Sequence, residues 1–147
     1  METELETRLE TVFKEAMDLK EVDAQTYSPL VLAYIGDAVY EVIVRTKVVN
    51  RGNMQVNKMH KKSAGLVKAS AQAELIKLLM EELTEEETAI YKRGRNAKSV
   101  STAKHATVVD YRMATGFEAL TGYLYLTGRM ERLITLISHG FQKMGEL

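Results

Sequence analysis

The chain has 147 residues, and its 46% hydrophobic content is enough to form one buried core, so composition favours a folded domain over disorder. The absence of cysteine excludes disulfides, zinc–thiolate sites and cysteine nucleophiles together, and fits a reducing, cytoplasmic location. A formal net charge of zero gives no overall preference for a nucleic acid. We expect a single domain over residues 1–147, with its core at about residues 27–140.

The first half of the chain shows the spacing of amphipathic and buried helices. Apolar residues recur at intervals of three and four over residues 5–16, which predicts a first helix. Ser28 and Pro29 then mark a helix start, because serine caps a helix and proline fits its first turn. The stretch that follows, to about Val49, is apolar on nearly every side, so we expect it at the centre of a helical bundle.

Helical spacing continues through the second half, and no segment alternates as a half-buried strand would. We expect one or two helices over residues 54–83 with a break near Gly65, a short helix opened by the capping box at residues 84–87 and ending near Gly94, a basic loop over residues 95–106, a long helix over residues 107–126, and a last helix ending near His139 and Gly140. This order predicts an all-α domain of some six or seven helices.

Asp37 interrupts the longest apolar run of the chain, which extends from Leu30 to Val44. That run is too short and too polar for a membrane span, which needs roughly 20 apolar residues, so we expect no membrane partner. An ionised carboxylate on a buried helix is costly unless it is paired or bound to a cation. Gly36 lowers helix stability by about 1 kcal/mol relative to alanine, which indicates that another helix or a ligand approaches closely there.

Glu118 lies in a second apolar helix, between Gly116 and Gly122, which also permit close packing. If the two helices are neighbours, the carboxylates of Asp37 and Glu118 can converge on Mg²⁺, a cation that prefers oxygen ligands. The same two residues also fit ordinary salt bridges, with Arg112 as one partner. Spacing alone leaves both interpretations open.

Charge is segregated along the chain although its total is zero. The acid-free windows between residues 41 and 74 and between residues 87 and 110 hold twelve of the twenty basic residues, as a local anion-binding surface requires. The alternative is that both windows are solvated surface. The candidates for contacts with RNA phosphates are Lys58, Lys61 and Lys62 on a helix, and Lys92, Arg93, Arg95, Asn96, Lys98 and Lys104 in and beside the predicted loop.

Two motifs resemble those of the ribonuclease III family. The run YIGDAV at residues 34–39 is similar to its signature, and the run FEALTGYLYLTG at residues 117–128 is similar to its second acidic motif. The resemblance begins at about residue 27 and is closest to the mini-ribonuclease III subfamily, which consists of the catalytic domain alone. It implies a dimeric ribonuclease III-like bundle that cleaves double-stranded RNA, with Asp37 and Glu118 as catalytic residues and ligands of Mg²⁺ or Mn²⁺.

The resemblance also implies a substrate and partners: precursor 23S ribosomal RNA, a second copy of the chain, and ribosomal proteins that assist. Two acids of the wider family are replaced here, by Ala33 and Thr115. This departure puts a complete two-metal site in doubt and supports an alternative function, a non-catalytic RNA-binding or ribosome-assembly protein on the same fold. A helical dimerisation module is a further alternative, but it leaves the basic windows unexplained.

Overall fold

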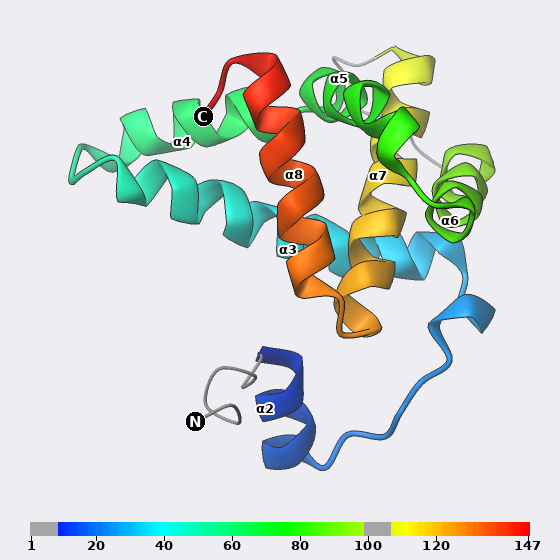
Figure 1. Ribbon diagram of the computed structural model, residues 1–147. Helices are drawn as coiled ribbons and strands as arrows, with labels where there is room; N and C mark the ends of the chain where they lie inside the picture. Colours follow the sequence, from blue (N-terminus) through cyan, green and yellow to red (C-terminus); the bar gives the residue numbers. More distant parts are fainter. Residues whose placement is uncertain (1–8, 99–106) are drawn as a thin grey trace.

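The computed structural model describes residues 9–98 and 107–147, and every regular element in this part of the chain is a helix (Figure 1). In chain order the elements are α2 (Leu9–Met17), η1 (Ala24–Thr26, a 3₁₀ turn), α3 (Pro29–Asn50), α4 (Val56–Val67), α5 (Ala69–Leu79), η2 (Met80–Glu82, a 3₁₀ turn), α6 (Glu85–Asn96), α7 (Val108–Leu126) and α8 (Met130–Met144). The all-α prediction is confirmed. Across the described residues, no helix has both the length and the apolarity to cross a membrane.

The central helix is α7, which packs against α3, α5, α6 and α8 and lies between α8 and α6 in Figure 1. Eleven of its nineteen residues are buried. The prediction that the helix at residues 28–49 is central is wrong, because one side of α3 is exposed. Neighbouring helices cover only the other side, which leaves Tyr34 80% exposed and Val42 62% exposed.

Two glycines let the backbones of α3 and α7 touch. A Cβ atom on Gly36 would lie 1.8 Å from the carbonyl oxygen of Glu118, and a Cβ atom on Gly122 would lie 2.0 Å from that of Leu32. No larger residue fits at either position without moving a helix. The close approach that both glycines predict is therefore confirmed, and it fixes the position of α3 along α7.

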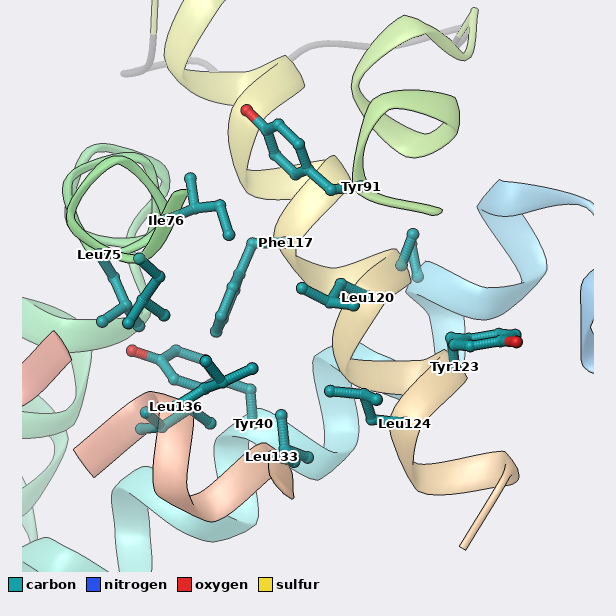
Figure 2. Packing of buried hydrophobic residues seen from close by; sticks show 14 of the residues in the cluster. Tyr40, Leu75, Ile76, Tyr91, Phe117, Leu120, Tyr123, Leu124, Leu133 and Leu136 are labelled. Atoms are coloured by element: carbon teal, nitrogen blue, oxygen red, sulfur yellow. The ribbon is translucent and has the colours of Figure 1, made fainter. Parts of the chain in front are cut away.

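The core forms where α3, α5, α7 and α8 meet (Figure 2). The rings of Tyr40 and Phe117 pack edge to face, with centroids 5.1 Å apart and planes at 87°, a favourable geometry for two aromatic quadrupoles. Leu75 of α5 and Leu136 of α8 lie around this pair in Figure 2. The Tyr40 hydroxyl donates to the carbonyl oxygen of Leu66 at 2.8 Å, so α4 is tied to the same core.

The helix starts predicted at Ser28 and Thr84 are confirmed. The Ser28 side chain accepts a hydrogen bond from the Leu30 amide, with Pro29 in the first turn. Thr84 and Glu87 form both hydrogen bonds of the capping box. These starts are local, because the capping side chain and the amide that it binds are two or three residues apart.

Three predicted helix ends differ from those of the structure by two to four residues. The break between α4 and α5 lies at Lys68, which has extended φ and ψ, whereas Gly65 is inside α4. The helix α6 continues to Asn96. The helix α8 continues through Gly140 to Met144. A Cβ atom on Gly140 would lie 2.1 Å from Cδ1 of Leu75. Gly140 therefore serves packing against α5 and does not end the helix.

Candidate active site

The packing of α3 on α7 brings Asp37 and Glu118 together. Gly36, which precedes Asp37, rests on the backbone of Glu118 itself. The Asp37 side chain is exposed and Glu118 is half-buried. The prediction that Asp37 is buried is wrong, because it lies on a part of α3 that the other helices leave uncovered. The site is therefore open to solvent on the α3 side and closed on the α7 side.

The electrostatics of Glu118 show that the two carboxyl groups share one site. Burial, first, and the charge of Asp37, second, raise the pKa of Glu118 to about 8, and a hydrogen bond from Gln72 acts in the opposite direction. Within the described residues neither carboxyl group forms an ion pair. The salt-bridge interpretation therefore finds no support in the described residues.

The donor set fits a hard divalent cation. The two neighbouring carboxyl groups, once ionised, provide the negative charge and the oxygen ligands that Mg²⁺ prefers. Among residues 9–98 and 107–147, no group of three or more acidic, histidine or cysteine side chains is placed to hold a metal ion, so the acidic pair would leave most of the coordination sphere to water. Mg²⁺ commonly keeps several waters and is held by one or two protein carboxylates together with phosphate oxygens of the substrate.

Nearby polar residues do not enlarge the acidic pair. Ala33 is buried, and the Thr115 hydroxyl donates to the carbonyl oxygen of Tyr111 at 3.0 Å, one turn earlier in its own helix. Glu41 accepts a hydrogen bond from Arg45 at 2.9 Å in an ion pair on the surface of α3. No acid in the described residues therefore takes the place of the two that are replaced by Ala33 and Thr115.

One residue that contacts the acidic pair is missing from the sequence-based prediction. Gln72 of α5 is buried, and its amide Nε2 donates to the Oε2 atom of Glu118 at 3.3 Å. The sequence carries a weak signal for it: Gln72 occupies the apolar face of α5, at helical spacing with Leu75, Ile76 and Leu79. A glutamine in such a row is unusual, but only the fold shows what it contacts.

The basic residues predicted on a helix lie on α4. Lys58, Lys61 and Lys62 are exposed. Across the described part of the chain, none of the three forms an ion pair. Their ammonium groups are therefore available to an anionic ligand.

The basic residues at the end of α6 differ in how far they are engaged. The Arg93 guanidinium donates to the carbonyl oxygens of Gln25 and Tyr27, so it holds the segment that leads into α3. Arg95 stacks over the Tyr91 ring at 5.7 Å and donates to the side-chain oxygen of Asn96. Lys92 and Lys98 are exposed, and Lys104 lies outside the described residues.

Comparisons with known proteins identify the family of the chain. The ribonuclease III domain family matches residues 30–129. The chain is 48% identical over 132 residues to Mini-ribonuclease 3 of Clostridium tetani, covering 84% of this chain and 87% of that protein. It is 53% identical over 119 residues to Mini-ribonuclease 3 of a Thermoanaerobacter species, with coverages of 81% and 84%. A crystal structure of a Fusobacterium nucleatum protein superposes with a TM-score of 0.74 at 32% identity, covering 83% of this chain and 96% of that one.

Proposed function

Because the chain belongs to the ribonuclease III family and is an endoribonuclease acting on double-stranded RNA, we propose that it cleaves RNA with Mg²⁺ held by Asp37 and Glu118. The main observation behind this proposal is that the charge of Asp37 repels that of Glu118 and helps to raise the pKa of Glu118, while neither carboxyl group has an ion-pair partner in the described residues. A bound cation removes that repulsion, and Mn²⁺ can take its place because it accepts the same oxygen ligands. The family assignment favours the enzyme over the two non-catalytic alternatives.

The reaction is hydrolysis of a phosphodiester bond. A water oxygen forms a new bond to phosphorus, the bond from phosphorus to one sugar oxygen breaks, and that oxygen takes up a proton. Mg²⁺ held by Asp37 and Glu118 would supply a more acidic water and would stabilise charge on the phosphate oxygens. Asp37 presents its exposed carboxylate on the side that RNA can reach, and Glu118 supplies a second carboxylate from the rigid centre of the bundle.

The duplex is held by the exposed lysines. Lys58, Lys61 and Lys62 of α4, with Lys92 and Lys98 near the end of α6, present ammonium groups to backbone phosphates. Arg95 and Asn96 lie at the same end of α6, and Lys104 stays a predicted contact. Arg93 contributes mainly by holding the segment before α3 through its two carbonyl contacts.

The decisive experiment is cleavage of a duplex RNA stem by the purified protein, with Mg²⁺ and then with excess EDTA. Asp37→Asn and Glu118→Gln keep the side-chain size but remove the charge, and each is expected to lower the rate by about 100-fold or more. Glu41→Gln is the matched control, because Glu41 lies on α3 in a surface ion pair and should retain activity. Cleavage that continues in EDTA would refute a metal-dependent mechanism.

We propose a narrower substrate, the double-stranded stalk of precursor 23S ribosomal RNA in the cytoplasm, which is what the resemblance of the two acidic motifs to the mini-ribonuclease III subfamily implies. Ribosomal proteins that present this stalk are proposed helpers. A transcript containing the stalk is expected to be cut at defined positions and faster than an unrelated duplex of equal length. Equal rates on both RNAs, with or without ribosomal proteins, would rule out this preference.

A second copy of the chain is the proposed partner. An apolar stripe follows α3 along its exposed side, where Val31, Tyr34, Val42 and Val49 are 46%, 80%, 62% and 59% exposed. Exposed apolar surface of this extent on one helix commonly marks an interaction site. We therefore propose that α3 forms the interface of a homodimer whose two acidic sites act on one duplex.

A further inference from the structure

Gln72 is the one buried amide beside the acidic pair in the described residues. Its side chain is 2% exposed, and it shares the apolar face of α5 with Leu75, Ile76 and Leu79. A glutamine in such a position must satisfy three or four hydrogen-bonding sites without water. The residues that surround it decide which sites are satisfied.

The break between α4 and α5 fixes the orientation of this amide. Because the helix stops at Lys68, the carbonyl oxygen of Val67 is free to accept a hydrogen bond from Gln72 Nε2 at 2.7 Å. A carbonyl oxygen cannot donate, so the amide nitrogen must lie on this side of the group. The same nitrogen therefore faces Glu118 and donates to its Oε2 atom at 3.3 Å.

The other end of the amide is unsatisfied. Gln72 Oε1 is buried and has no hydrogen-bond partner in the described part of the chain. An unsatisfied buried acceptor costs about 1–3 kcal/mol, and an apolar residue of similar shape would avoid that cost. Glutamine is thus a poor choice for stability at this position, which indicates that its contact with Glu118 serves another purpose.

We propose that Gln72 is a positioning residue that holds the Glu118 carboxylate, between α3 and α5, in the orientation that binds the cation together with Asp37. This inference rests on the proposed function. Two contacts then fix Glu118: its backbone packs against Gly36, and one oxygen of its side chain accepts a hydrogen bond from Gln72. Replacing a residue that hydrogen-bonds to a metal ligand, without itself touching the metal, commonly lowers metal affinity by 10- to 100-fold.

The test is direct binding of Mg²⁺ and Mn²⁺ to the full chain by titration calorimetry, together with the melting temperature. Gln72→Met keeps the length of the side chain and removes the amide. We expect cation affinity to fall by about 10-fold or more, while the melting temperature stays equal or rises because the unsatisfied oxygen is gone. Gln72→Asn keeps an amide that is one methylene too short, and we expect the same loss of affinity.

Thr121→Val is the matched control, because Thr121 is fully buried on the same helix as Glu118 and donates only to its own helix, at Phe117. Its cation affinity should equal that of the unmodified chain. Unchanged affinity in both Gln72 variants, or an equal loss in Thr121→Val, overturns the role of Gln72. Asp37→Asn separates the two proposals: if it binds the cation as tightly as the unmodified chain, the proposed metal site fails and the role of Gln72 fails with it.

Discussion

At Glu118 two effects act against ionisation, burial first and the Asp37 charge second, and together they raise its pKa to about 8. A glutamate in water has a pKa near 4.5, so the metal-free fold favours the neutral acid over a wide range of pH. An ionised carboxyl group in this position lowers the stability of the fold, whereas a bound cation would stabilise the ionised form. Perturbed carboxyl groups of this kind are typical of functional sites.

The pH dependence of stability follows from that shift. Because the folded pKa exceeds the unfolded one, the neutral Glu118 stabilises the metal-free fold fully below about pH 4.5, and this contribution is lost as the pH rises through about 8. We therefore expect the melting temperature of Glu118→Gln, measured in EDTA, to rise relative to that of the unmodified chain between pH 5 and pH 9. Parallel melting profiles for the two proteins would show that Glu118 is not perturbed.

At this scale the sequence allowed the acids to be predicted but not their surroundings. Asp37 and Glu118 were recognisable because each interrupts an apolar helix near a glycine and lies in a motif that resembles those of the ribonuclease III family. Gln72 was not, because it is 46 residues from Glu118 and a glutamine in a helix is ordinarily solvated. The exposure of Asp37 was also missed, since it depends on which side of α3 the other helices cover.

At the scale of elements, the contact between α3 and α7 sets the site. Gly36→Ala would place a methyl group 1.8 Å from a backbone oxygen of α7, and two helix backbones must separate to admit it. We expect a loss of about 3 kcal/mol or more in the free energy of unfolding, at the upper end for overpacking. Chemical denaturation measures this loss, and weakened cation binding should accompany it.

Gly65→Ala is the matched control for that substitution. Gly65 is inside α4, and a Cβ atom there would meet nothing within 4 Å. Alanine should therefore stabilise the fold by about 0.5–1 kcal/mol through helix propensity. A Gly36→Ala variant as stable as the unmodified chain would show that α3 and α7 are not in backbone contact.

The predicted helix ends at Gly65 and Gly140 differ from those of the structure because the effect of a glycine depends on its surroundings in the fold. From sequence, Gly65 and Gly140 both suggest an interruption, because glycine weakens helices. In the fold Gly65 faces open space and Gly140 admits Leu75, so neither ends a helix. The starts at Ser28 and Thr84 were predictable because a cap and the amide that it binds are neighbours in sequence.

On the scale of the whole molecule, zero net charge conceals a basic surface on α4. Each lysine that neutralises a phosphate contributes about 0.9 to the slope of log affinity against log salt for a duplex. Replacing Lys61 and Lys62 by glutamine should therefore weaken binding of a duplex RNA and lower that slope by about 2. Lys143→Gln is the control, because this lysine binds Glu82 and the Leu78 carbonyl oxygen. An unchanged slope in the double variant would remove α4 from the RNA-binding surface.

The apolar stripe on α3 gives the remaining prediction at this scale, because the described residues leave it uncovered. If the stripe is a dimer interface, a charge in its middle should prevent association while the monomer stays folded. Val42→Lys supplies that charge, at a side chain that is 62% exposed.

Val109→Lys is the matched control, because Val109 is 63% exposed on α7, away from the stripe. Sedimentation equilibrium should then show a dimer for the unmodified chain and for Val109→Lys, and a monomer for Val42→Lys. A monomeric unmodified chain, or a dimer that persists in Val42→Lys, would exclude this face of α3 as the interface.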